Sequence, residues 1–575
     1  MTTIQANPIP QRPNPDFPTL SDDALGALKL AWRWVNVDDD WSINGEVADN
    51  WDRWTGWPYM AKLTYDLTYI VRLVAKIAQE IPAWREVCGA IAESCLERMF
   101  QYGSWCDWVE QPGLDPNVAN YPALYYKHTI PRGYAGVMNA PGYAGNGVST
   151  AMDGLAQSFG WAPVGRFQDL PGRLGGSNKP PYLPQHSPAV GRVYDPDPVY
   201  GNGSSNMMYK GYLLEQFTLT KSITGSAKYE GKQKLTYNDE IQFEYSCHDV
   251  ARILSEQMGT PVDSNGSSLR FGVDCEVGKA FPLCISVGGN ATHLYDKLYG
   301  TNYVSTYLDW LEYGKQWIAG GADPEGPVDF CVPYYARDIR YNMTLPEQQV
   351  PLFWTGLALQ VSVHDRKFAE RIYEGTIKHH GLVHPDGALQ ITLGKEFVGD
   401  AILSDLWAEC AALACAHEFG DWSRYDAIKL HMDKNYEMTR KDGEAYYTFG
   451  LDEPWPRGIP NHITMWSWAG GPGSLKRLYT APDVAKFTQP TVVGVDFPTL
   501  TLNQAYTDEQ GTLHIGVAPG RPGVEGTTTK FRVTQLPETT RSVEFNGQPW
   551  TGWTELSSSE IEISTSVGRG YFRVR

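Results

Sequence analysis

The sequence predicts a mainly α-helical protein, an (α/α)6 barrel that carries a long loop insertion and is followed by a small C-terminal antiparallel β-sandwich. Three observations predict this fold class. Apolar residues recur at helical spacing from residue 22 to about residue 480, a long segment rich in Gly, Pro and Tyr interrupts this pattern at 111–206, and the apolar period becomes two after residue 487.

The helical region contains about twelve segments of helical periodicity, many of them begun by Pro or ended by Gly. They cover residues 22–36, 59–81, 90–102, 207–225, 236–258, 282–299, 303–318, 349–363, 366–380, 400–419, 422–439 and 461–479. Helices in hairpin pairs, with no strand runs between them to form a parallel sheet, are what an (α/α)6 barrel requires, with inner helices around a central cavity. An irregular helical array is the alternative.

The same patterns divide the chain into segments. Residues 1–21 are polar and Pro-rich and are expected to form an arm, and residues 22–480 are expected to form the barrel domain. The segment 111–206 is too long for an ordinary connector, so we interpret it as an insertion over the barrel mouth, with a surface decoration as the alternative. Residues 487–575 alternate as strands do, and Asn546-Gly547 is a hairpin turn signal within them.

Charge and composition restrict the partners. The net charge of −18 disfavours nucleic acid and anionic membranes, which require clustered Lys and Arg. The sequence has no apolar run near the roughly 18 residues of a membrane span and no secretory signal pattern, so we expect a cytoplasmic protein. A 13% aromatic content suits a pocket for a hydrophobic small molecule or stacking against sugars. A homo-oligomer is compatible with all of this.

The nine cysteines are scattered and include no CxxC pair, which favours reduced thiols over a disulfide framework or a zinc ribbon. Two of them lie nine positions apart in FGVDCEVGKAFPLC, residues 271–284. Asp274 and Glu276 flank Cys275, and nearby negative charge keeps a thiol protonated. Cys284 follows Pro282 at an expected helix start, where the helix dipole lowers a thiol pKa. Two thiols tuned in opposite directions suit acid–base work, and two buried structural cysteines are the alternative.

Four stretches together resemble the linalool dehydratase-isomerase family. They are MYKGYL (208–213), TGSAKYE (224–230), CEVGKAFPLC (275–284) and LYDKLYGTNY (294–303), and weaker similarity extends over about residues 30–480. The resemblance implies an (α/α)6 barrel and cofactor-free addition or removal of water, or allylic isomerisation, on small isoprenoid alcohols. The insertion and the C-terminal sandwich lie outside it.

The resemblance also implies site residues. Cys275 and Cys284 fall on the family's catalytic thiols, and Asp38 and Asp39 in NVDDDW are the nearest candidates for its acidic residue. The residues expected to contact substrate are Tyr65, Met208, Glu276, Phe281 and Phe353.

One departure from the family concerns proton transfer. Tyr212 stands where the family's MYKGHLN motif has its catalytic histidine, and the early cysteine of the family has no counterpart. A tyrosine, with a pKa near 10, donates a hydrogen bond but is a poor base at neutral pH. We keep Tyr212 among the candidate catalytic residues and expect a substrate that differs from the family's.

These observations predict a cofactor-independent dehydratase or isomerase that acts by general acid–base catalysis on an apolar alkene or allylic alcohol of terpenoid or polyketide origin. A cyclase or pericyclase of a polyene natural product is one alternative, because the histidine is missing. A glycosidase or polysaccharide lyase on a helical barrel is another, and a pocket that binds or folds a hydrophobic ligand without any acid or base is the third.

Two further motifs are weaker. Asp405 and Glu409 lie one turn apart, as the paired carboxylates of a glycosidase would, but such pairs usually form a solvated helix face. His380 and His384 in HHGLVH are spaced for a metal if helical, yet Gly381 and a following Pro oppose a regular helix there. We expect neither a metal nor a cofactor.

Overall fold

The structure is a computed structural model of the 575-residue chain. It describes residues 19–36, 67–81, 84–100, 197–199, 207–236, 242–259, 272–273, 279–333, 335–336, 341–342, 351–392, 401–447, 489–538 and 541–575. Most of the expected N-terminal arm, almost all of the 111–206 insertion and the whole expected helix at 461–479 lie outside these residues.

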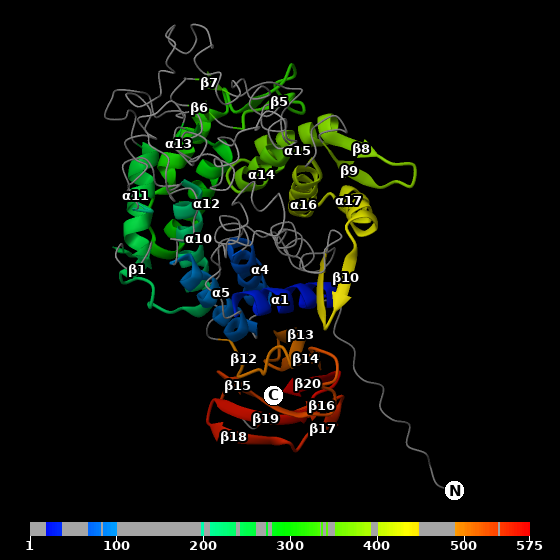
Figure 1. The fold of residues 1–575 in the computed structure, drawn as a ribbon. Helices are drawn as coiled ribbons and strands as arrows, with labels where there is room; N and C mark the ends of the chain where they lie inside the picture. Colours follow the sequence, from blue (N-terminus) through cyan, green and yellow to red (C-terminus); the bar gives the residue numbers. More distant parts are fainter. Residues whose placement is uncertain are drawn as a thin grey trace, which may run out of the picture.

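Helices make up most of the described chain before residue 436 (Figure 1). They are α1 (Asp22–Val35), α4 (Leu67–Glu80), α5 (Arg85–Met99), α10 (Met207–Thr224), α11 (Cys247–Gly259), α12 (Pro282–Tyr299), α13 (Val304–Gly314), α14 (Pro351–Val361), α15 (Arg366–His380), α16 (Ala401–Phe419) and α17 (Trp422–Asn435). Local signals explain several ends, because the side chains of Ser21 and Asp365 cap α1 and α15, and Gly300 ends α12 in the left-handed conformation. The mainly α-helical prediction is confirmed for this part of the chain.

The helices differ in how much of their surface is buried. Helices α10, α12 and α14 are buried around nearly their whole circumference, whereas α15 and α17 bury one side only. A Cβ on Gly211 of α10 would lie 3.0 Å from the side chain of Val287 on α12, so the glycine allows these two helices to pack closely. Closure of the helices into an (α/α)6 barrel stays a prediction.

Short antiparallel strand pairs lie between several of the helices, and helical periodicity did not reveal them. They are β1 (Gln233–Thr236) with β2 (Gln242–Tyr245), β3 (Lys279–Ala280) with β6 (Tyr335–Ala336) and β7 (Tyr341–Asn342), β4 (Ala319–Gly320) with β5 (Phe330–Cys331), β8 (Gly381–Val383) with β9 (Leu389–Ile391), and β10 (Met438–Lys441) with β11 (Glu444–Tyr447).

Three expected helices therefore have different ends. The helix expected at 236–258 begins at residue 247, because Ser246 and Asp249 form a reciprocal capping box there. The helix expected at 303–318 ends at Gly314, ahead of strand β4. The helix expected at 422–439 ends at Asn435, ahead of a hairpin whose Asp442-Gly443 turn has positive φ at both residues.

The C-terminal part consists of two antiparallel sheets, as the period-two pattern predicts. One has the order β12 (Thr491–Val493), β15 (Thr528–Thr534), β19 (Glu560–Ser566), β18 (Trp553–Ser557), and the other β13 (Leu500–Thr507), β14 (Leu513–Pro519), β20 (Gly570–Val574), β16 (Val543–Phe545), β17 (Gln548–Pro549). Phe531 and Phe572 pack edge to face between them, 5.6 Å apart. The predicted Asn546-Gly547 turn is confirmed, since both residues have positive φ between β16 and β17.

The two sheets lie at one end of the helical part, beside α1 and α5 (Figure 1). The Leu20 N–H donates to the Asn503 carbonyl at 2.9 Å, and Phe497 packs its ring against Trp84 at 5.6 Å. The sheets thus make contacts with the helices through both backbone and aromatic side chains.

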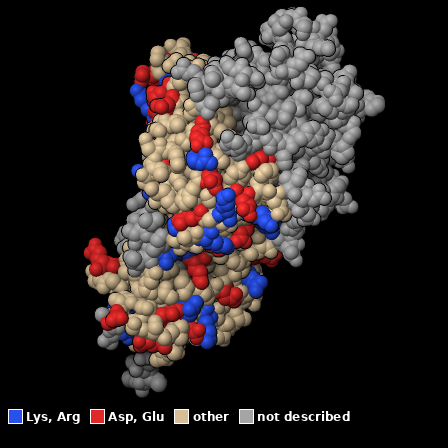
Figure 2. Space-filling model, turned by 90° about the vertical axis from the view of Figure 1, so that its left-hand side faces the viewer, with Lys and Arg blue, Asp and Glu red and all other residues tan. Residues whose placement is uncertain are grey.

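The thiols and the surface agree with the composition. Each of the seven cysteines within the described ranges is free and buried, which confirms the reduced-thiol prediction for them. No helix in these ranges is both long and apolar enough to span a membrane. On the face shown in Figure 2, acidic and basic side chains are intermixed.

Candidate functional site

The first turn of α12 brings three predicted site residues together. Phe281 precedes the helix, Pro282 begins it as the sequence predicts, and Cys284 in its first turn is only 4% exposed. Phe353 of α14 packs against Phe281 with 5.8 Å between ring centroids. This end of α12 is therefore an apolar environment with one thiol in it.

The other half of the predicted thiol pair is not described. Cys275 and Glu276, like Asp38, Asp39 and Tyr65, lie outside the described residues. The nearest described residue before Cys275 is Val273, and its neighbour Gly272 lies against Ile285, directly after Cys284. The proton-relay pair stays a prediction.

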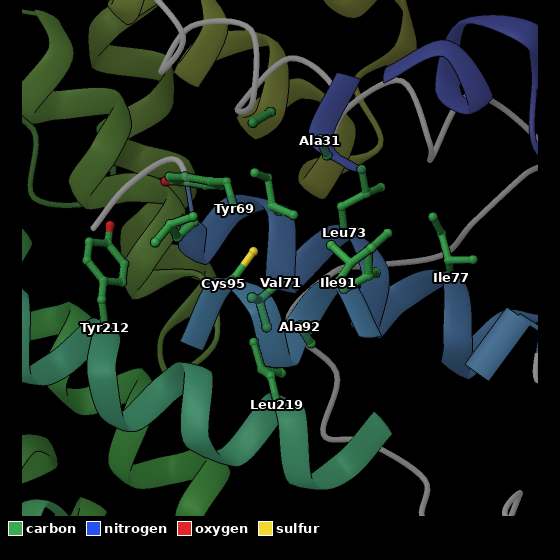
Figure 3. Packing of buried hydrophobic residues seen from close by; sticks show 14 of the residues in the cluster. Ala31, Tyr69, Val71, Leu73, Ile77, Ile91, Ala92, Cys95, Tyr212 and Leu219 are labelled. Atoms are coloured by element: carbon green, nitrogen blue, oxygen red, sulfur yellow. The ribbon is translucent and has the colours of Figure 1, made fainter. Parts of the chain in front are cut away.

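One face of α10 carries the remaining predicted residues. Met208 and Tyr212 are four positions apart on this helix and are both buried. Tyr212 projects from α10 toward Tyr69 of α4 (Figure 3). Burial is the main influence on the pKa of Tyr69 and raises it, whereas the nearby Tyr212 has a small effect in the opposite direction.

Beside the two tyrosines lies a buried ion pair. Arg72 donates from Nε and Nη2 to the two carboxylate oxygens of Glu215, at 2.5 and 2.7 Å, and both side chains are at most 3% exposed. The Arg72 guanidinium also lies 5.0 Å from the ring centroid of Tyr69 and 5.6 Å from that of Tyr212. Both phenol rings therefore contact one fixed cation.

A chain of side-chain hydrogen bonds continues from this pair. Arg72 Nη2 donates to Gln360 Oε1 at 3.2 Å, and Asn290 Nδ2 donates to the same oxygen at 2.7 Å. His364 Nε2 donates to Asn290 Oδ1 at 2.9 Å. The network links α4, α10, α12 and α14 through buried polar groups.

Burial controls the protonation of this cluster. Burial raises the pKa of Tyr69 to about 12, and Arg72 acts in the opposite direction. Burial and the neighbouring His293 lower the pKa of His364 to about 3. At neutral pH the phenol of Tyr69 is therefore protonated and the imidazole of His364 is neutral.

The sequence reading missed Tyr69, Arg72, Glu215, Gln360, Asn290 and His364. A signal was available, because Arg72 stands within the apolar stretch YIVRLVAKI and Glu215 within the buried helix after MYKGYL. A charge on the apolar face of a helix indicates a buried partner.

Glu409 corrects another expectation. It is fully buried, not on a solvated face: it accepts from the Ile391 N–H at 3.0 Å and from His431 Nδ1 at 3.1 Å. Burial raises the pKa of Glu409, whereas His431 and Tyr436 act against this. Asp405, its proposed glycosidase partner, has no described side chain. Glu409 thus joins α16, α17 and β9.

The histidine motif shows no metal geometry. His380 ends α15 and packs edge-on against Trp354, whereas His384 lies beyond β8 and stacks on His431. Within the described ranges no group of three His, Cys, Asp or Glu side chains is placed to hold a metal ion.

The site includes Cys284 in the first turn of α12 and Tyr212 and Glu215 on the buried face of α10. All three residues lie within a segment that matches a known protein family. Residues 186–450 match the linalool dehydratase/isomerase family. The resemblance inferred from the four sequence stretches is confirmed over this range, just under half of the chain. Tyr69 and Arg72 lie before the matched segment.

Solved structures resemble the chain only remotely. One is a glycoside hydrolase, 11% identical, with a TM-score of 0.23 over 68% of this chain and 70% of that chain. Another is a GH127 β-L-arabinofuranosidase from Geobacillus stearothermophilus T6, 10% identical, with a TM-score of 0.24 over 96% of this chain and 75% of that chain.

Proposed function

We propose that this protein is a cofactor-independent enzyme of the dehydratase/isomerase type that acts on an apolar alkene or allylic alcohol of terpenoid or polyketide origin. The match of residues 186–450 to linalool dehydratase/isomerase supports the proposal most directly. The buried, aromatic environment of Cys284, with Phe281 and Phe353 beside it, suits an apolar substrate.

The proposed chemistry is general acid–base catalysis. One acid, Cys275 or one of Asp38 and Asp39, protonates the leaving hydroxyl as its C–O bond breaks, and water leaves. A second group, for which we propose Cys284, takes a proton from the adjacent carbon, and the C–H electron pair becomes the new double bond. Hydration is the same sequence in reverse, and no electrons are exchanged with a co-reactant.

The decisive experiment is incubation of the purified full-length chain with linalool and with other C10 allylic alcohols, followed by product analysis by gas chromatography and mass spectrometry. The same incubation in D2O detects deuterium on carbon, which acid–base exchange requires. Cys275→Ala and Cys284→Ala are expected to lower turnover by about 10²-fold or more, the usual contribution of a general acid or base.

A matched control tests whether removal of any buried thiol lowers turnover. Cys410 of α16 is fully buried, like Cys284, but lies on a different helix. Cys410→Ala is expected to retain turnover. Full turnover in both Cys275→Ala and Cys284→Ala would contradict the thiol mechanism.

A polyene cyclase remains the second candidate, and Tyr212 is the observation that favours it. A site with a phenol in place of an imidazole has one base fewer for deprotonation, which favours rearrangement over elimination. Cyclic products from a C10 or C15 polyene alcohol would support this variant. Release of reducing sugar from oligosaccharides would instead favour a carbohydrate-active enzyme.

A further inference from the structure

We propose that Tyr69 and Tyr212, held against the guanidinium of Arg72, form a two-phenol donor site that hydrogen-bonds the oxygen of the substrate. This inference rests on the proposed function and names the residues that hold its alcohol. Arg72 and Glu215 act as positioning residues, because they orient the phenols.

The first support is the cost of the buried pair. Removing Arg72 and Glu215 from water costs several kcal/mol per ion, and apolar replacements of a buried pair are often as stable or more so. The pair lies deep in the core, where its sequence neighbours Val71, Leu73 and Leu214 are all fully buried. Such a pair is poor evidence for stability and better evidence for a positioned charge.

The second support is the direction in which the cation acts. Glu215 occupies one edge of the guanidinium and Gln360 accepts from Nη2, so Arg72 is fixed in orientation. Its charge then lies on the faces of both phenol rings, 5.0 and 5.6 Å from their centroids. A cation at a phenol ring withdraws electron density and makes the O–H a stronger hydrogen-bond donor.

The third support is the protonation of the phenols, whose rings lie at one guanidinium. A protonated phenol donates one hydrogen bond from its hydroxyl. Since burial keeps Tyr69 protonated at neutral pH, its hydroxyl donates a hydrogen bond and does not accept a proton from carbon. Donors aimed at an oxygen stabilise the negative charge that develops on it as a C–O bond breaks.

A fluorine probe tests contact with the alcohol independently of turnover. 3-Fluorotyrosine is placed at position 212 in the full chain, and ¹⁹F NMR is recorded with linalool or with a C10 hydrocarbon that lacks the hydroxyl. We expect the alcohol, and not the hydrocarbon, to shift the resonance, and Arg72→Met to reduce the shift several-fold. The control position is Tyr209 of the same helix, whose hydroxyl donates to the Met99 carbonyl at 2.6 Å and is expected to be insensitive.

The outcomes separate this inference from the proposed function. An alcohol-dependent shift without any dehydration or isomerisation product supports the donor site and refutes the proposed reaction. Turnover of linalool with no shift at position 212, or equal shifts from alcohol and hydrocarbon, overturns the donor site. Absence of both shift and turnover overturns both.

A pH profile distinguishes a donor from a packing residue where turnover is found. Tyr212→His places a group of pKa near 6.5 beside Tyr69. The plot of kcat against pH is therefore expected to show a transition near pH 6.5 that the wild type lacks. Tyr212→Phe is expected to lower kcat by about 10²–10³-fold, as loss of one such donor does. Arg72→Lys should recover part of the kcat lost in Arg72→Met. Unchanged kcat in Tyr212→Phe, or no new transition in Tyr212→His, refutes the role.

Discussion

Glu215→Ala tests whether the buried ion pair is electrostatically compensated as the structure indicates. The substitution removes the carboxylate and leaves the Arg72 guanidinium, 3% exposed, with Gln360 as an acceptor. Two charge-assisted hydrogen bonds are lost, each worth about 1.5–3 kcal/mol. The expected loss in the free energy of unfolding is about 3–5 kcal/mol, the usual result of breaking a buried pair.

The assay is urea unfolding followed by far-ultraviolet circular dichroism, which reports on the helices. The double variant R72M/E215L is the essential companion, because it removes both charges and fills the volume with apolar atoms. It is expected to lie within about 1–2 kcal/mol of the wild type and to be more stable than Glu215→Ala. The exposed pair of Arg252 and Glu256 is the control, and Glu256→Ala should cost less than about 1 kcal/mol.

Two results would refute this reasoning. A cost for Glu215→Ala no larger than that for Glu256→Ala would mean that water reaches Arg72. A double variant as unstable as Glu215→Ala would mean that the loss comes from packing and not from the unpaired charge.

Three other predictions follow from burial and packing. The pKa of His364 is depressed to about 3, so the stabilising contribution of the neutral imidazole is complete above pH 6.5 and is lost as the pH falls. Between pH 7 and 5, the free energy of unfolding of the wild type, measured in urea, should fall by about 2 kcal/mol more than that of His364→Gln. Equal losses in the two proteins would contradict this. Gly289→Ala should lower the free energy of unfolding by about 1–3 kcal/mol, because its Cβ would lie 2.3 Å from the Tyr307 ring, while Gly231→Ala, with open space, should not. The aromatic disulfide DTNB should label at most two of the nine thiols rapidly in the native chain, since seven are buried, and a third fast thiol would contradict the packing.

Local signals predicted the elements that depend on nearby residues. Pro282 begins α12 where the sequence places a helix start, and Asn546-Gly547 forms a hairpin turn. The Asp442-Gly443 turn carries the same kind of signal and was missed, because helical periodicity was extended across it. The Ser246 capping box was missed for the same reason. The sequence contained these boundaries, but apolar periodicity alone does not reveal them.

Pairings between distant residues could not be predicted in this way. Arg72 and Glu215 are 143 positions apart, and Arg72 and Gln360 are 288 apart. A single sequence contains no information about which helices become neighbours at that distance. Helical spacing also does not distinguish a solvated carboxylate from a buried one, which explains the wrong expectation for Glu409.

The distribution of buried charge separates the two parts of the molecule. Within the described residues, the buried charged or imidazole side chains all lie in helices: Arg72, Lys76, Lys210, Glu215, Glu409, His417, Glu418 and His431. The two C-terminal sheets bury polar residues as well, but these are only Thr and Gln. One or two hydrogen bonds satisfy an uncharged hydroxyl or amide group in a core, whereas a buried charge needs an oppositely charged partner and further hydrogen bonds fixed around it. If the donor site is right, loss of catalysis should therefore follow substitutions on α4 and α10, and substitutions within the sheets should change stability without changing the pH profile.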